Sequence, residues 1–248
     1  MSSEYNVAVI DVETLHSADD CRHCGAAKND HHQPAPAVLA CRSGQSITYE
    51  PIGWDDHAAL GLSIGCLYRH DAEQYQFFDV HTLESTMRWL VEAQPLIVSF
   101  NGIAFDSQLM ARVLWALHDE TWLGEGLFTA WTLLWERSYD ILAEIWSVDP
   151  GRKFERGLNS LGAISQNNGY GTKEMDGAMA PRLWAQGHHA EVAHYCMSDV
   201  WKTRRLFEQI VATRFIEGWS TSMLGCVMPQ GVLSGPLQLQ LIDVPEAL

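Results

Sequence analysis

The sequence predicts an α/β fold with a mixed central sheet flanked by helices, and three observations predict it. Short apolar runs of β type occupy residues 7–10, 60–68, 75–80 and 95–102. Segments with helical periodicity are interspersed with these runs and dominate the second half of the chain. Apolar residues make up 47% and charged residues 19%, which is typical of a globular protein. Strands interspersed with helices indicate one layered domain, which we expect to span residues 1–248.

Charge and targeting features restrict the function classes. The formal net charge is −15, which argues against an independent, sequence-unspecific grip on long duplex nucleic acid. A nucleic-acid enzyme whose site is charged by bound metal stays compatible with this charge. No apolar run reaches the length of about 18 residues that a membrane span needs, and the N-terminus has no basic and apolar leader. We therefore expect a cytoplasmic protein with no membrane contact.

The first strand is predicted at Val7–Ile10 and runs directly into Asp11 and Glu13. Side chains two apart on a strand point the same way, so both carboxylates should share one face. Two unit negative charges about 5 Å apart repel by roughly 3 kcal/mol at an effective dielectric constant of about 20. A pair of this kind at the end of a core strand needs an explanation, and the other acidic residues provide one.

An irregular stretch at 15–57, rich in Pro, Gly, Asp, His and Cys, separates this strand from the next one. A loop of this length is typically functional or an insertion. Two strands, a helix capped by Thr82 and a third strand should follow. These expected elements are 60–68, 75–80, 82–94 and 95–102, the last ending at Asn101-Gly102.

The second half of the chain is predicted to be mainly helical. Apolar residues recur every four positions in one segment, at Leu109, Val113 and Leu117. We expect residues 218–248 to form a turn-rich C-terminal extension with short strands. The expected helices are 105–119, 138–146, 157–169 and 189–216.

Further acidic residues occupy comparable places. Asp106 lies in the first turn of a predicted helix, where the helix dipole favours a carboxylate. Tyr195 and Asp199 are one turn apart on one face of the longest predicted helix. Each segment has an apolar body that can be buried while its acid reaches a common edge. Four carboxylates converging there would repel unless two divalent cations, Mg²⁺ or Mn²⁺, neutralise them.

Three short motifs resemble those of a known enzyme superfamily. "DVE" at 11–13, "NGIAFD" at 101–106 and "YCMSD" at 195–199 are similar to the D-x-E, N-x-x-x-F-D and Y-x-x-x-D motifs of DEDD 3′–5′ exonucleases. The tyrosine variant (DEDDy) is shared with proofreading domains of family B DNA polymerases and with stand-alone bacterial and phage exonucleases. The resemblance extends from Val7 to Phe207, and it implies a ribonuclease H-like fold and phosphodiester hydrolysis from a 3′ end.

The resemblance also implies roles for individual residues. Asp11, Glu13 and Asp199 would ligate a catalytic Mg²⁺ or Mn²⁺. Asp11 would bridge to a second such ion, which Asp106 would support. Tyr195 would orient the attacking water, and a nucleoside 5′-monophosphate would be released.

The residue that acts on water has an alternative. His194 precedes Tyr195, so the chain also contains the H-x-x-x-x-D spacing of the histidine variant of the superfamily. Histidine has an unperturbed pKa near 6.5, which suits a general base at neutral pH. Neighbouring residues on a helix differ by about 100° in direction, so one of the two can face the metals. The residues of the second and third motifs, "NGIAFD" and "YCMSD", resemble the tyrosine variant and therefore favour Tyr195.

A second candidate metal site lies in the irregular stretch. Cys21 and Cys24 have the C-x₂-C spacing of a structural Zn²⁺ site, which His31 and Cys41 would complete. His16 or His23 could substitute for His31. The alternative is a loop with free thiols.

Substrate contacts are expected from two places. Asn101 and Phe105 belong to the second motif, and the superfamily places apolar side chains near the terminal base. Arg152 and Lys153 lie in a basic loop with an aromatic residue, which could bind a phosphate and stack a base. A solvated loop is the alternative there. Three further basic residues, Lys202, Arg204 and Arg205, are expected on a solvated helix face.

The expected substrates are 3′ ends of single-stranded DNA or RNA, or short oligonucleotides, because the net charge disfavours processive binding. The same charge is also compatible with a protein partner that recruits the enzyme to its substrate. Two rivals stay open. One is an inactive adaptor of the same fold that uses the Cys-rich loop for a protein partner, and the other is an endonuclease that cuts internally.

Overall fold

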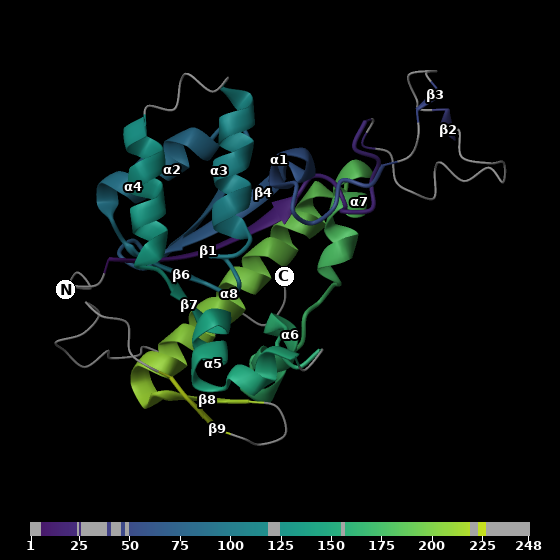
Figure 1. Cartoon of the computed structure of the whole chain (residues 1–248). Coiled ribbons are helices and arrows are strands. Elements are labelled where there is room, and N and C mark those ends of the chain that lie inside the picture. The colour runs from purple at the N-terminus through teal and green to yellow at the C-terminus, as the bar shows by residue number, and fades with distance from the viewer. Residues whose placement is uncertain are drawn as a thin grey trace.

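A computed structural model of the chain describes residues 6–23, 25, 39–40, 46–47, 50–118, 125–154, 157–218 and 223–226. At its centre is a five-stranded sheet in the order β5-β4-β1-β6-β7 (Figure 1). The strands are β1 (Val7–Thr14), β4 (Leu62–Arg69), β5 (Gln74–Phe78), β6 (Leu96–Ser99) and β7 (Tyr139–Asp140). β1 is antiparallel to β4 and β4 to β5, whereas β6 is parallel to both β1 and β7. The prediction of a mixed sheet is confirmed.

Helices cover both faces of this sheet. α2, α3 and α4 lie together on one face, and the long helix α8 crosses the other (Figure 1). The longer helices are α2 (Leu83–Ala93), α3 (Asp106–Leu117), α4 (Glu125–Glu136), α5 (Ile141–Val148) and α8 (His189–Thr213). The shorter ones are α1 (His57–Leu60), α6 (Leu161–Asn167), α7 (Ala180–Ala185) and the 3₁₀ helices η2 (Pro150–Phe154) and η3 (Gly177–Met179). This layered α/β architecture is that of the predicted ribonuclease H-like fold.

Two hairpins lie outside the central sheet. β2 (Leu39–Ala40) pairs with β3 (Ser46–Ile47), and β8 (Phe215–Glu217) pairs with β9 (Met223–Gly225). The first falls within the stretch predicted to be irregular, and the second begins where the long helix was expected to continue. Within the described ranges, no helix combines the length and apolar character that crossing a bilayer requires.

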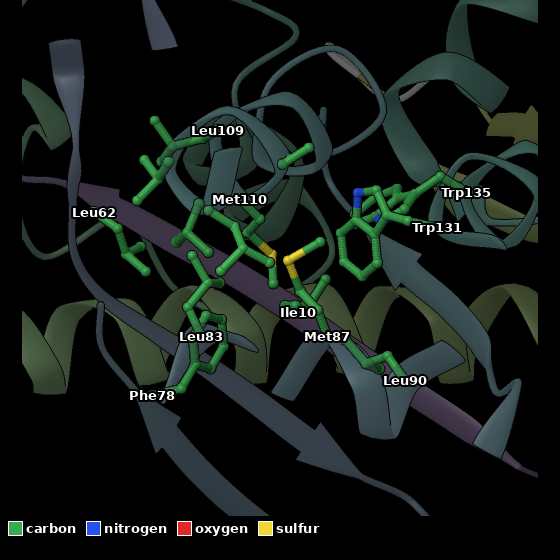
Figure 2. Close-up of a cluster of buried hydrophobic side chains, with 14 of the residues drawn as sticks. Ile10, Leu62, Phe78, Leu83, Met87, Leu90, Leu109, Met110, Trp131 and Trp135 are labelled. Atoms are coloured by element: carbon green, nitrogen blue, oxygen red, sulfur yellow. The ribbon is translucent and has the colours of Figure 1, made fainter. Parts of the chain in front are cut away.

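The alternation of side chains along β1 divides the core in two. Ala8, Ile10 and Val12 point to the side of α2, α3 and α4, where they meet buried residues such as Met110 and Trp131 (Figure 2). The odd-numbered residues point to the opposite side, where Val7 and Val9 pack with α8. Because the period of a strand is two, every later odd-numbered residue of β1 also faces α8.

The pairing of β1 changes along its length. Its parallel ladder with β6 covers Val7–Val9, whereas its antiparallel ladder with β4 continues to Thr14. The second half of β1 is therefore held on one side by β4. On its other side, α8 and the turn after β6 can approach the strand. The edge of β1 that is not paired with β6 beyond Val9 is therefore the place where polar side chains of β1 can meet those of other elements.

The structure corrects several predicted boundaries. The first strand continues past Ile10, so Asp11 lies within β1 rather than after it. The long helix ends at Thr213 because Arg214 adopts a left-handed conformation, with φ 67°. Thr82 makes no side-chain cap for α2, since its hydroxyl bonds to Asp79 instead. Leu117, expected on the apolar face of α3, is half exposed.

Several helices were not predicted: the short α1 and α7, the two 3₁₀ helices and, as the longest of them, α4. α4 packs on the same core as α2 and α3, and its Trp131 and Trp135 are buried there (Figure 2). Leu133 and Phe128 of the same helix are exposed. Apolar residues on both faces obscure the helical period, which explains the omission.

Candidate active site

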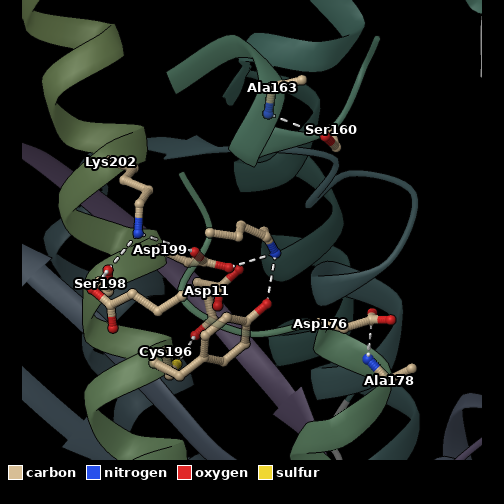
Figure 3. A network of polar contacts seen from close by, with 12 residues as sticks. Asp11, Ser160, Ala163, Asp176, Ala178, Cys196, Ser198, Asp199 and Lys202 are labelled. Atoms are coloured by element: carbon tan, nitrogen blue, oxygen red, sulfur yellow. Dashed lines mark hydrogen bonds and ion pairs between the residues drawn. The ribbon is translucent and has the colours of Figure 1, made fainter. Parts of the chain in front are cut away.

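The two acids of the first motif lie on the α8 face of the sheet. Asp11 and Glu13 continue the odd-numbered row of β1, and Glu13 is 8% exposed. The Cys196 thiol of α8 donates to the backbone carbonyl of Asp11 at 3.5 Å. Single side-chain atoms of Asp11, Glu13 and Cys196 lie within 4.8 Å of one another. Figure 3 shows Asp11 on its strand directly beside α8.

The acid of the second motif is brought in by the turn between β6 and α3. Asp106 is the first residue of α3 and is 5% exposed. A Cβ at Gly102 would lie 2.5 Å from the Cβ of Ser99 and 2.9 Å from Oδ2 of Asp106, so this turn has room for glycine alone. Asn101 adopts φ 70°, a left-handed conformation in which asparagine is enriched.

A carboxylate that the sequence did not indicate holds this turn. Asp140, at the end of β7, accepts from the backbone amides of Asn101 at 2.9 Å and Ile103 at 3.0 Å. The same carboxylate caps α5 through the amides of Leu142 and Ala143. A buried carboxylate with several amide donors is well satisfied, so Asp140 is a positioning residue for the second motif.

α8 presents Tyr195 and Asp199 to the same place. Tyr195 is 3% exposed and Asp199 is 1% exposed, and both lie on the buried face of the helix. His194 points elsewhere: its side chain is 57% exposed and its Nδ1 lies 3.2 Å from Glu174. The structure therefore brings together Asp11, Glu13, Asp106, Tyr195 and Asp199, and leaves His194 at the surface.

Lys173 is the main group that sequence reasoning missed. Its ammonium donates to the hydroxyl of Tyr195 at 2.7 Å and lies 2.6 Å from Oδ2 of Asp199. A Cβ at Gly162 would come within 2.9 Å of the Lys173 side chain, so a glycine of α6 makes room for it. A lone loop lysine has no periodicity that would have marked it.

The pKa shifts in the site show that ionising the clustered carboxyl groups is unfavourable in the absence of further cations. Burial, together with the Asp199 charge, raises the pKa of Asp11 to about 7. Burial and the Asp11 charge raise the pKa values of Glu13 and Asp106 well above their usual range. Burial alone would lower the pKa of Lys173, but Asp199 and Tyr195 outweigh it and raise that pKa. The ammonium groups of Lys173 and Lys202, both near Asp199, do not balance four acids, so the site favours further positive charge.

The residues present fit divalent cations of the Mg²⁺ class. Three buried carboxylate oxygens have no hydrogen-bond partner among the described residues: Oδ2 of Asp11, Oδ2 of Asp106 and Oδ1 of Asp199. Such oxygens are the ligands that Mg²⁺ and Mn²⁺ prefer. Cys196 does not suit this role, because burial raises the pKa of its thiol and keeps it protonated.

A second lysine corrects the prediction of a solvated helix face. Lys202 is 3% exposed, donates to the Ser198 hydroxyl and lies 3.9 Å from Oδ1 of Asp199 (Figure 3). Ser198 in turn donates to Glu174 at 3.1 Å. The next two basic residues are also only partly exposed, and both pair with the buried Glu208: Arg204 at 2.7 Å and Arg205 at 3.0 Å.

The predicted substrate residues are distributed differently. Phe105 lies next to Asp106 and is partly buried against the α3 core. Arg152 is 4% exposed, and Lys153 lies over the Trp146 ring at 5.2 Å. Arg152 and Lys153 thus belong to η2 and its contacts with α5, and within the described residues no hydrogen bond or ion pair joins them to the four acids.

The predicted zinc site falls mostly outside the described residues. Cys24, His31 and Cys41 lie there, whereas Cys21 is buried in a bridge between its backbone and Pro51. His16 and His23 lie near carboxylates, at 3.8 Å from Asp20 and 3.4 Å from Glu50. The zinc site stays a prediction.

Comparison with known proteins identifies the family. Residues 63–215 match the model of a family described as a predicted 3′–5′ exonuclease related to the exonuclease domain of PolB. No curated protein matches the chain. The matched segment contains Asp106, Lys173, Tyr195 and Asp199, and the fold adds the acids of β1 to them. Since the match covers more than half of its residues, the chain belongs to this family of predicted 3′–5′ exonucleases.

Proposed function

We propose that this protein is a metal-dependent 3′–5′ exonuclease that releases nucleoside 5′-monophosphates from single-stranded DNA or RNA ends, or from short oligonucleotides. One observation carries the proposal. Three buried acids and the partly buried Asp11, from β1, α3 and α8, converge beside a buried tyrosine, and three of the four keep an oxygen without a hydrogen-bond partner among the described residues. Family membership supports nuclease chemistry at this place.

Two divalent cations would be held by the acids. Asp11, Glu13 and Asp199 would hold one, and Asp11 with Asp106 would hold the other. Cations bound there lower the pKa of water and neutralise charge on the phosphate. The positions of the acids on three different elements make this a site assembled by the fold, and Asp140 keeps the turn before Asp106 in place.

Hydrolysis places a water oxygen on phosphorus, breaks the bond to the 3′ oxygen of the preceding nucleotide and delivers a proton to that oxygen. Tyr195 would orient the water. Burial, reinforced by the Asp199 charge, raises the pKa of its hydroxyl, so it stays protonated at neutral pH. Its oxygen accepts from Lys173, which leaves its own proton available as a donor. A tyrosine in this state positions water rather than deprotonating it.

The same geometry favours Tyr195 over His194. Tyr195 is buried beside Asp199, whereas the imidazole of His194 is exposed and paired with Glu174. A residue that acts on water at the acids must reach them, so we assign His194 no catalytic role.

The test incubates 5′-labelled single-stranded DNA and RNA oligonucleotides with the protein and Mn²⁺. We expect a ladder that shortens from the 3′ end and nucleoside 5′-monophosphates as product. Asp11→Ala should abolish it, and Tyr195→Phe should slow it by about 10²–10³, as loss of a positioned acid–base or orienting group does. His194→Ala should leave the rate within about twofold.

Matched controls exist elsewhere in the chain. Asp71→Ala removes an exposed carboxylate that pairs with Arg69, and Tyr170→Phe removes a hydroxyl that bonds to Gln209. Both should retain the wild-type rate. Internal fragments without a ladder would indicate the endonuclease instead. Absence of cleavage, together with absence of Mn²⁺ binding, would leave the inactive adaptor.

A further inference from the structure

Residues 52–58 and helix α3 line an open cavity of about 520 Å³. Ile52, His57 and their neighbours form one wall, and Arg112 of α3 forms the other. α1 packs directly against α3 here. Nothing in the proposed chemistry uses this cavity, although one of its lining residues, His57, contacts Phe105, the residue that precedes Asp106.

Aromatic contacts link the cavity to Phe105, the residue before Asp106. Phe105 is the neighbour of Asp106, and the His57 ring meets the Phe105 ring edge-on at 5.4 Å. The Trp54 ring meets Phe105 in the same way at 6.2 Å. Trp54 nevertheless keeps 60% of its surface exposed, which is unusual for a side chain of this size. An indole that is presented to solvent is a platform on which a base can stack.

The segment that carries Trp54 is anchored. The amides of Ile52 and Gly53 donate to the carbonyls of Asp20 and Ala18 at 3.0 and 2.9 Å. Gly53 adopts φ 80°, a conformation that glycine tolerates without strain. The backbone that carries Trp54 is therefore ordered before any ligand arrives, which reduces the entropy cost of binding.

The charges around the cavity suit a phosphate. Arg112 is exposed, and no described residue forms an ion pair with it. Arg22, by contrast, is neutralised by Asp56 at 3.3 Å. Arg112 follows Phe105 by two helical turns, so both lie on one face of α3, about 10 Å apart along its axis. Asp55 is an exposed anion on the same rim and opposes the attraction.

We infer that Trp54, His57, Phe105 and Arg112 bind the single strand on the 5′ side of the scissile phosphate, with a base stacked on Trp54 and a phosphate on Arg112. The inference rests on the proposed function, since it names the path of the substrate to that site. Stacking on an exposed ring requires an unpaired base, so the ligand is single-stranded and not duplex.

The first test measures binding of a 5′-fluorescein-labelled thymidine octanucleotide by anisotropy in Ca²⁺. Trp54→Ala should weaken binding about tenfold. Arg112→Gln should weaken it and reduce the slope of log K against log salt by about 0.7, the value for one phosphate of a single strand. Asp55→Asn should tighten it. Unchanged binding in Trp54→Ala and Arg112→Gln would overturn the inference.

Two control variants match the size and charge of these changes. Phe128→Ala removes an exposed aromatic ring of α4, and Arg137→Gln removes an exposed cation just after α4. Both should bind the octanucleotide as the wild type does. Weakening as strong as in Trp54→Ala and Arg112→Gln would show a general effect of surface composition and would overturn the inference.

The second test separates this inference from the proposed function. The p-nitrophenyl ester of thymidine 5′-monophosphate has the terminal nucleotide but no upstream strand. With Mn²⁺, Trp54→Ala and Arg112→Gln should hydrolyse it at the wild-type rate and lose about tenfold in kcat/KM on the octanucleotide. Equal losses on both substrates would overturn the inference while the function stands. A wild type that cleaves neither substrate would overturn the proposed function itself.

Discussion

At the scale of single residues, the site depends on residues that lie outside the three sequence motifs. The carboxylate of Asp140 accepts hydrogen bonds from the backbone amides of Asn101 and Ile103, which lie 39 and 37 residues earlier in the chain. Lys173, which donates to Tyr195, lies 22 residues before it. The acids of the motifs could be predicted because their residue types and order are distinctive. The partners that hold them could not, since a lone aspartate or lysine acquires its role only when the fold brings distant segments together.

Asp140→Asn tests the positioning role. The amide side chain replaces one acceptor oxygen by a donor, which would face the amides that Asp140 now accepts from. We expect a loss of about 2–3 kcal/mol in the free energy of unfolding, measured by urea denaturation, because hydrogen bonds to a charged group are involved. Asp176→Asn is the control: this exposed carboxylate accepts from one amide, that of Ala178, and should cost under about 1 kcal/mol. Equal losses would contradict the role of Asp140.

Lys173→Met tests how the acids are neutralised. In the metal-free protein, the ammonium is a counter-charge for Asp199, so its removal should lower the melting temperature in EDTA. The same ammonium competes with a bound cation for Oδ2 of Asp199, so Mn²⁺ should bind the variant more tightly, by about tenfold in calorimetric titration. Weaker Mn²⁺ binding in the variant would show instead that Lys173 supports the ligand geometry.

At the scale of elements, close approach matters as much as periodicity. α6 is an ordinary short helix with a Ser160 cap, yet its Gly162 lies against the side chain and backbone nitrogen of Lys173. The sequence predicted a helix here, over residues 157–169. It did not predict the contact, because a helical pattern says which face is buried and not how near the neighbouring chain lies.

Gly162→Ala should therefore destabilise the protein, although alanine is normally favoured over glycine in a helix by about 1 kcal/mol. The added Cβ would lie 2.9 Å from Lys173 Cγ and 3.2 Å from its backbone nitrogen. We expect a net loss of about 1–2 kcal/mol in urea unfolding and slower hydrolysis.

Gly126→Ala is the matched control for this change. Gly126 is also helical, in α4, and a Cβ there would meet nothing within 4 Å. This variant should gain up to about 1 kcal/mol in the free energy of unfolding. A gain in both variants would show that α6 can move away from Lys173 at no cost.

At the scale of the molecule, β1 divides its residues between stability and chemistry. Its even-numbered side chains fill the core under α2, α3 and α4, and its odd-numbered ones pass from Val7 and Val9 to Asp11 and Glu13. The fold class and the convergence of acids were predictable from this alternation and from the order of the motifs. The open edge of β1 beyond Val9, which lets α8 close over the acids, was not predictable. The sequence of a single strand does not specify its pairing partners or its register.

This arrangement predicts how the stability of the metal-free protein depends on pH. In the folded state burial raises the pKa of Asp11 from 3.8 to about 7, so the folded protein holds this proton over a range in which the unfolded chain has lost it. The stabilisation is present in full below about pH 4 and is lost as the pH rises through about 7. The neighbouring Glu13 and Asp106 shift in the same direction.

Asp11→Asn isolates the effect, because the amide mimics the protonated acid at every pH. In EDTA, the melting temperature of Asp11→Asn relative to wild type should increase steadily between about pH 4 and pH 8. Mn²⁺ should reverse the order at pH 8, since it stabilises only the protein that keeps its carboxylate ligands. A difference between the two proteins that does not change with pH in EDTA would mean that Asp11 is ionised throughout. In that case Lys173 alone would balance its charge, and the site would have less need of cations than its unpartnered oxygens indicate.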